Sequence, residues 1–192
     1  DSGKLLNLND SRMIFSKLLR IQDDGIFSKK ALANFDKISN SVLNEETYTS
    51  LQIFEKFLSY ICVLNDSKIS CDQTPRNVFY IREILEIFPE ARVINMIRDP
   101  RDVLLSQKNK WKRRYLGASS IPFIESVRSY FNYHPIVISK IWNSSISTSS
   151  HFKNHPRVLT IYFEDLLLNP RDKISEACDF LEINFSEEMM NI

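Results

Sequence analysis

A short apolar run that leads straight into a helix start constrains the fold of this chain more than any other feature. Residues Arg92 to Ile97 read RVINMI, a mostly apolar run of the kind expected for a buried parallel strand. Asp99-Pro100 follows, and Asp is a good N-cap while Pro is favoured at the first helical position. The segment therefore predicts a strand, a turn and a helix in direct succession.

The same alternation of strand and helix patterns recurs along the chain. Further strands are expected at Lys68–Asp72 and Val158–Tyr162. The first 64 residues read as helical, with one apolar face over Leu51–Ile61, and further helices are expected at Ile81–Phe88, at Pro122–Trp142 with a bend or break at Pro135, and after Asn169-Pro170. A Ser-rich loop is expected at Asn143–Ser150. Strands that alternate with helices indicate an α/β fold with a parallel sheet.

Composition excludes several classes of protein. With 192 residues, the chain is expected to form a single domain over residues 1–192, large enough to bury a core without disulfides or metal. A formal net charge of +1 argues against a protein that coats nucleic acid or an anionic membrane. The three glycines are scattered, so no glycine-rich phosphate loop can be built from these residues. No apolar stretch reaches the roughly 18 residues of a membrane span.

The cysteines and histidines form no pattern typical of a metal site or a disulfide framework. The three cysteines are odd in number and lack C-x-x-C spacing, and the three histidines have no Cys or Glu at metal-ligand spacing. We therefore expect no metal. Unpaired cysteines and the lack of a signal peptide favour the cytoplasm, while N-x-[ST] sequons leave the secretory lumen open as the alternative.

The turn after the expected strand at Arg92–Ile97 is the best candidate for an anion site. Arg98 leaves the strand at its carboxyl end, where ligands bind in open α/β sheets, and its guanidinium can grip phosphate oxygens. Ser106 lies about two turns into the helix and can donate its hydroxyl to the same anion, and Lys110 follows one turn later on the same face. In the alternative interpretation, Arg98 pairs with Asp102 and Ser106 is only a small helix residue.

A run of cations adjoins this candidate site and contains Trp111 and Tyr115. Its members are Lys108, Lys110, Lys112, Arg113 and Arg114. Most such runs are solvated helix faces. Beside an anion site, the run favours a nucleotide or an acidic substrate nearby.

Two segments resemble the sulfotransferase family. Residues Cys71–Ser106 are similar to the middle of the family, where a K-T-P-like segment leads into the R-D-P-R-D-x-x-x-S motif of the 3′-phosphate site. Residues Tyr162–Met189 are similar to its Y-E-D-L strand-to-helix segment and the helix that follows. Together they cover about a third of the chain, in the family's order, and are closest in style to the bacterial and protein-tyrosine branches.

The resemblance implies both an architecture and an activity. The fold would be a P-loop-like, three-layer α/β domain with a central parallel sheet flanked by helices. The reaction would move a sulfuryl group from 3′-phosphoadenosine 5′-phosphosulfate to a hydroxyl or amine, without a metal. Arg98 and Ser106 would hold the 3′-phosphate, with Lys110 as a supporting cation. Phe163 would contact the adenine where the family has Tyr, and Tyr162 would point to the opposite face of the strand.

The chain departs from the family pattern at three places. The loop that wraps the 5′-phosphosulfate is expected upstream of Asp1, together with its strand and much of its helix. Gln73 stands where many members have a Lys that neutralises charge on the bridging oxygen, and Gln can donate a hydrogen bond without carrying that charge. Asp72 and Thr74 would face the transferred group or, equally well, cap the next helix. No acid adjoins Gly3, where the protein-tyrosine branch has its catalytic Glu, so the general base is unassigned.

Three other functions compete with this interpretation. A non-catalytic nucleotide-binding domain with the same fold is the main alternative, a P-loop kinase relative is the second, and a nucleic-acid binder is the least favoured. The acceptor is a small molecule, a carbohydrate or a protein, and its pocket walls are expected from the helices at Asn7–Leu64 and Pro122–Trp142. The aromatic residues expected there are Phe123, Tyr130, Phe131 and Tyr133. The sequence leaves open whether the chain forms a homodimer.

Overall fold

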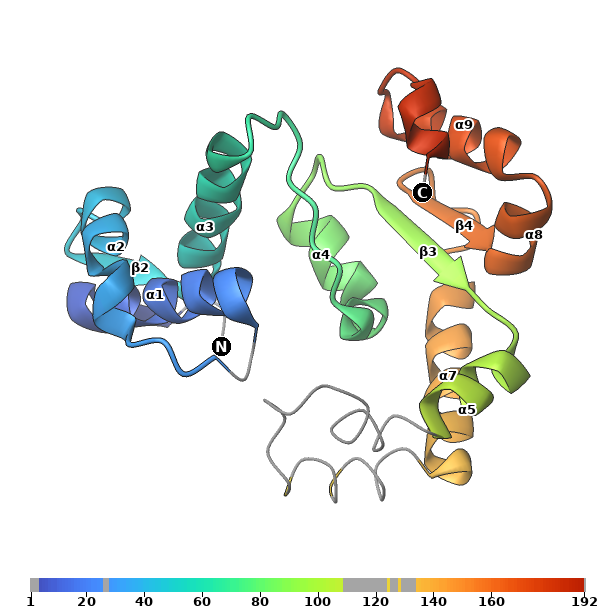
Figure 1. The fold of residues 1–192 in the computed structure, drawn as a ribbon, viewed down its shortest axis with the longest axis horizontal. Helices are drawn as coiled ribbons and strands as arrows, with labels where there is room; N and C mark the ends of the chain where they lie inside the picture. Colours follow the sequence, from blue (N-terminus) through green and yellow to red (C-terminus); the bar gives the residue numbers. More distant parts are fainter. Residues whose placement is uncertain (1–3, 26–27, 109–123, 125–127, 129–133, 192) are drawn as a thin grey trace. The chain divides into compact units, whose positions relative to one another are not determined.

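The computed structural model describes residues 4–25, 28–108, 124, 128 and 134–191. These residues form two compact units, one ending at Gln73 and one beginning at Thr74 (Figure 1). Each unit has a hydrophobic core of its own.

The first unit is mainly helical. It contains β1 (Leu5–Asn7), α1 (Leu8–Asp24), the 3₁₀ helix η1 (Leu32–Phe35), α2 (Asp36–Val42), β2 (Thr47–Thr49) and α3 (Ser50–Leu64). Helix α3 confirms the helix predicted over Leu51–Ile61. The prediction that all of the first 64 residues are helical is wrong at β1 and β2, which pair antiparallel with Leu5 opposite Thr49. Strands of three residues are too short to show a period in the sequence.

Side-chain caps determine where the two long helices of this unit begin. The Asn7 side chain accepts a hydrogen bond from the Asp10 N–H at the start of α1 (2.9 Å). At the start of α3, the Thr49 hydroxyl accepts from the Gln52 N–H (3.2 Å), and the Gln52 side chain accepts from the Thr49 N–H (2.8 Å). Both arrangements satisfy N–H groups that a helix start leaves without partners.

An aromatic core holds the first unit together. Its buried members are Phe15, Leu19, Leu43, Tyr48, Ile53 and Phe57. The rings of Phe15 and Phe57 meet edge to face, with centroids 6.1 Å apart. The buried Tyr48 hydroxyl accepts hydrogen bonds from the N–H groups of Asn44 (2.8 Å) and Glu45 (2.9 Å), so the polar end of this ring is satisfied.

The second unit combines a parallel strand pair with helices. Its elements are the 3₁₀ helix η2 (Pro75–Tyr80), α4 (Ile81–Ile87), β3 (Val93–Ile97), α5 (Pro100–Lys108), α7 (Pro135–Ser150), β4 (Val158–Tyr162), α8 (Phe163–Leu168), α9 (Pro170–Leu181) and the 3₁₀ helix η4 (Glu187–Met190). These confirm the predicted strands at Arg92–Ile97 and Val158–Tyr162 and the predicted starts of α5 and α9. The six-residue helix α8 was not predicted.

Strands β3 and β4 pair in parallel, from Val93 opposite Val158 to Ile97 opposite Tyr162. The expected parallel arrangement is thus present, and within the described residues it consists of this one pair rather than a larger central sheet. Met96 on β3 is 47% exposed, so the prediction of a buried strand is wrong for one face of β3.

Helix α4 packs against the strand pair and is fastened by Arg157. Ile81 and Leu85 of α4 form the core of this unit with Val158. The Arg157 guanidinium donates to the carbonyls of Leu85 (2.8 Å) and Phe88 (3.0 Å) at the end of α4. This arginine therefore joins the end of α4 to the start of β4.

The strand predicted at Lys68–Asp72 is wrong. These residues are exposed and adopt no strand conformation. The segment connects the two units in sequence, and no described strand pairs with it. An extended run becomes a strand only when a neighbour completes its hydrogen-bond ladder.

The Ser-rich loop predicted at Asn143–Ser150 is also wrong, because these residues continue helix α7 to Ser150. The hydroxyls of Ser145 and Thr148 donate to carbonyls four residues earlier, at 2.8 and 2.9 Å. Ser and Thr hydroxyls can donate to carbonyls of their own helix, so a Ser-rich segment is compatible with a helix as well as with a loop. The break expected at Pro135 is confirmed as the start of α7, whereas most of Pro122–Tyr133 lies outside the described residues.

No helix in the described parts of the chain is both long enough and apolar enough to cross a membrane.

Candidate functional site

The turn between β3 and α5 carries the candidate site. Asp99 precedes Pro100, and its carboxylate accepts a hydrogen bond from the Arg101 N–H (2.8 Å). The Asp99 carbonyl accepts from the Val103 N–H (3.1 Å), which begins the helical hydrogen bonds. The capping role predicted for Asp99 is confirmed, and the turn brings Arg98 to the carboxyl end of the parallel pair.

Arg101 is committed to a carboxylate. Its Nε lies 3.0 and 3.2 Å from the two oxygens of Asp99, and its Nη2 lies 2.6 Å from one of them. These hydrogen bonds from Arg101 lower the pKa of Asp99 from 3.8 to about 2. These contacts use the Nε–H and one Nη2–H of Arg101, so this arginine is paired with a carboxylate of its own turn.

Arg98 is not committed in this way. Its Nη2 lies 3.5 Å from one oxygen of Asp102, and its Nε–H is buried without a hydrogen-bond partner. The pairing with Asp102 that the sequence left as the alternative is thus present, but as one long contact between side chains that are 42% and 53% exposed. Such pairs contribute little, so an anion can compete for this guanidinium.

The Arg98 guanidinium also lies over the ring of Phe163, 4.7 Å from its centroid. Phe163 is the first residue of α8, directly after Tyr162 at the end of β4. Because Phe163 belongs to the helix, the alternation of a strand does not govern its direction. The expectation that Tyr162 and Phe163 occupy opposite faces of one strand is therefore wrong, because only Tyr162 belongs to the strand.

Two side chains that the sequence did not single out meet at the turn. Trp142 of α7 donates its Nε1–H to the Arg98 carbonyl (3.1 Å), and Glu164 of α8 accepts from the Asp99 N–H (2.8 Å). They lie 44 and 65 residues away along the chain. Glu164 falls within the segment similar to Y-E-D-L, but no pattern pointed to Trp142.

The remaining predicted phosphate ligands lie along α5. Ser106 is exposed and follows Asp102 by four residues, so the two share one helix face. Asp102 is the residue that Arg98 reaches, which places Ser106 one turn farther along the same face. Lys110 lies outside the described residues, as do Trp111, Tyr115 and most of the cation run.

The predicted residues near the transferred group lie in or beside the first unit. Asp72 and Gln73 are exposed and end that unit, while Thr74 begins the second one. Two acidic residues of the first unit have partners of their own: Asp23 pairs with Lys30, and Asp24 accepts a hydrogen bond from the Ser28 hydroxyl. Among the described residues, no group of three or more His, Cys, Asp or Glu side chains could hold a metal.

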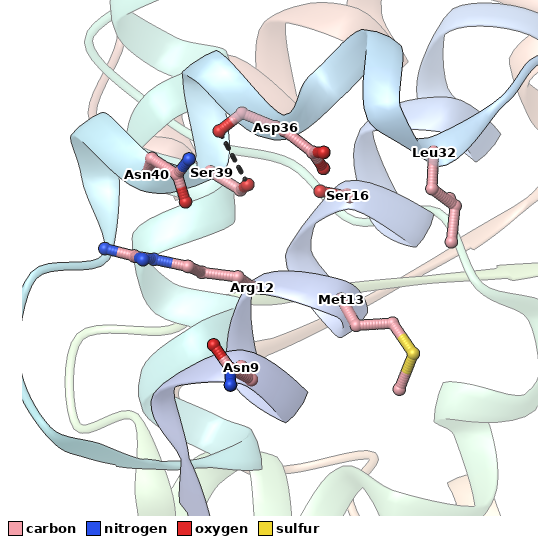
Figure 2. A pocket seen from close by; sticks show the side chains of 8 residues that line it. All are labelled: Asn9, Arg12, Met13, Ser16, Leu32, Asp36, Ser39 and Asn40. Atoms are coloured by element: carbon pink, nitrogen blue, oxygen red, sulfur yellow. Dashed lines mark hydrogen bonds between the residues drawn. The ribbon is translucent and has the colours of Figure 1, made fainter.

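A polar pocket of about 250 Å³ lies in the first unit, and the sequence did not predict it. Figure 2 shows its lining residues, Asn9, Arg12, Met13, Ser16, Leu32, Asp36, Ser39 and Asn40. Arg12 is held there by the Leu43 carbonyl, 2.9 Å from its Nη2. The Ser16 hydroxyl is buried without a hydrogen-bond partner.

Comparison with known proteins places these features in context. The model of the sulfotransferase family matches residues 9–187. A relative from Caenorhabditis elegans, provisionally named a protein-tyrosine sulfotransferase, is 24% identical over 160 residues, which are 81% of this chain and 56% of the relative. Sulfotransferase 2A6 of Mus musculus is 29% identical over 105 residues, 54% of this chain and 35% of the relative. The chain thus spans about half, or less, of the length of the curated relatives it matches.

Proposed function

This chain belongs to the sulfotransferase family, and from that premise we propose that it transfers a sulfuryl group from 3′-phosphoadenosine 5′-phosphosulfate to a hydroxyl or amine acceptor. The acceptor oxygen or nitrogen would attack sulfur as the bond from sulfur to the bridging phosphate oxygen breaks. Adenosine 3′,5′-bisphosphate would leave, and a base would take the proton of the acceptor. As in phosphoryl transfer, positioning and charge stabilisation would supply most of the catalysis.

The state of Arg98 is the observation that carries this proposal. Two arginines flank the turn, and Arg101 is the one whose Nε and Nη2 both hydrogen-bond to a carboxylate, that of Asp99. Arg98 has one long, exposed contact and an unused Nε–H at the carboxyl end of a parallel strand. In α/β folds this is where anionic ligands bind. We assign the 3′-phosphate to Arg98 and Ser106, with Lys110 as a supporting cation.

Phe163 is proposed to pack against the adenine. Its ring already contacts the Arg98 guanidinium, so base and 3′-phosphate would bind to neighbouring side chains. A phenyl ring can stack on a base but cannot hydrogen-bond to it. Recognition of adenine by this residue would therefore depend on shape and stacking.

The second candidate function is a nucleotide-binding domain without catalysis. Gln73 favours it, because a neutral amide there cannot neutralise the charge that develops on the bridging oxygen. Both functions require the nucleotide at Arg98, and only the transferase requires turnover. Two relatives have names that refer to protein tyrosine, which makes a tyrosine hydroxyl the first acceptor to try.

Calorimetric titration of adenosine 3′,5′-bisphosphate into the chain tests the site. We expect saturable binding that Arg98→Ala weakens by at least about tenfold, since a charge-assisted contact is lost. Arg82→Ala is the matched control, because it removes the same charge from the exposed side of α4 in the same unit. Equal affinity of the two variants would contradict the assignment of Arg98. If radiolabelled donor then yields no sulfated tyrosine, carbohydrate or small alcohol, the non-catalytic function is the better one.

A further inference from the structure

The peptide bond between Arg98 and Asp99 lies outside regular secondary structure. Strand β3 ends at Ile97 and α5 begins at Pro100, so this peptide belongs to neither element. The rotation of its plane nevertheless sets the direction in which Arg98 leaves the strand and the angle at which α5 begins. A half-buried peptide also needs partners for its carbonyl and its N–H.

Side chains from two other elements supply both partners. The carbonyl of this peptide accepts from the Trp142 Nε1–H, and its N–H donates to the Glu164 carboxylate. One hydrogen bond allows a peptide plane to rotate about the bonded group. Two bonds at opposite edges of the plane, from α7 and from α8, remove that freedom.

Helix α8 also contacts the side chain of Arg98. Its first residue, Phe163, lies against the Arg98 guanidinium, and its second residue, Glu164, holds the backbone. Glu164 carries a negative charge, which would oppose the binding of an anion nearby. Its value to the site must therefore come from the hydrogen bond and not from its charge.

We propose that Trp142 and Glu164 are positioning residues that hold Arg98 in the orientation needed for the 3′-phosphate. This inference rests on the proposed function of Arg98. The two residues act through the Arg98–Asp99 peptide and need not contact the nucleotide.

Paired substitutions separate the hydrogen bond from the charge. Glu164→Ala removes the acceptor, whereas Glu164→Gln keeps an acceptor oxygen and removes the charge. Trp142→Phe keeps a large ring and removes the Nε1–H. We expect Glu164→Ala and Trp142→Phe each to weaken binding of adenosine 3′,5′-bisphosphate about five- to tenfold, as for one lost hydrogen bond, and Glu164→Gln to bind at least as tightly as the unaltered chain.

Hydrogen exchange of the Asp99 amide, followed by NMR, supplies a readout that does not depend on the nucleotide. Exchange should be slow in the unaltered chain and in Glu164→Gln, and faster in Glu164→Ala. The matched control is Glu176→Ala, which removes an exposed carboxylate that pairs with Lys173 on α9. It should change neither exchange nor affinity.

The outcomes distinguish this inference from the proposed function. If the unaltered chain binds no nucleotide, the proposed function fails, and the positioning role in binding fails with it even where the amide is protected. If the unaltered chain binds and Glu164→Ala binds equally well, only the positioning role is overturned. Equally weak binding by Glu164→Gln and Glu164→Ala would show that the charge matters, which also contradicts the inference.

Discussion

The two units of this chain differ in the size of their hydrophobic cores. The first unit closes around Phe15, Tyr48 and Ile53, each with no measurable exposure. The second unit has a smaller core beside α4 and leaves Ile94 and Met96 of β3 exposed. The proposed anion site lies in this second unit, where these side chains of β3 are accessible. The comparison suggests that packing dominates the stability of the first unit and that specific polar contacts shape the second.

Phe15→Ala should have the largest effect of the substitutions that test this comparison. Its ring is fully buried and contacts Phe57 and Tyr60, so its loss should lower the free energy of unfolding by about 3–5 kcal/mol. Met96→Ala in the second unit should cost about 0.5 kcal/mol or less, because that side chain is exposed. Urea unfolding followed by far-UV circular dichroism measures both values. Similar losses for the two variants would refute the difference in burial between Phe15 and Met96.

Ser16→Ala in the first unit should have a smaller effect of opposite sign, an increase in the free energy of unfolding. The Ser16 hydroxyl is buried in α1 without a partner, and Ala is the better helix former, so stability should rise by about 0.5–1 kcal/mol. Ser11→Ala is the matched control on the same helix, since its equally buried hydroxyl donates to the Asn7 carbonyl (2.8 Å). The prediction fails if Ser16→Ala is no more stable than Ser11→Ala in the same denaturation measurement.

The pH dependence of Asp99 gives the smallest effect and probes the polar contacts of the second unit. Its pKa is about 2 in the folded chain, below its ordinary value of 3.8, because Arg101 bonds to the charged form. The charged form therefore stabilises the fold fully above pH 3.8, and this contribution disappears as the pH falls from 3.8 toward 2. Carboxyl-carbon NMR should show Arg101→Gln raising the pKa of Asp99, while Arg82→Gln should leave it unchanged. If Arg101→Gln leaves the pKa of Asp99 unchanged, the pair between Asp99 and Arg101 is absent in solution.

Local sequence patterns predicted those helices and strands whose own residues show a helical face, an apolar run or a helix cap. Helix α3 has an apolar face, strands β3 and β4 are short apolar runs, and Asp99-Pro100 marks the start of α5. The placement of Arg98 at the end of β3 follows from these elements alone. The position of Arg98 could therefore be predicted from the sequence, because a strand, a turn and a cap are defined by neighbouring residues.

The failed predictions concern segments whose residue types suit more than one conformation. Lys68–Asp72 reads as a strand but has no neighbouring strand to pair with among the described residues. Asn143–Ser150 reads as a loop, yet its hydroxyls bond back onto α7 and Ser149 is buried. Side-chain type alone does not decide between these states when both satisfy the backbone.

The sequence by itself determined where an arginine meets the end of a parallel strand, because that arrangement is local. Only the tertiary structure decided that Trp142 and Glu164 converge on one peptide bond. Hydrogen bonds between residues 44 and 65 positions apart depend on how α7 and α8 pack around the turn. No local pattern records that packing, since it is set by the contacts of the whole unit.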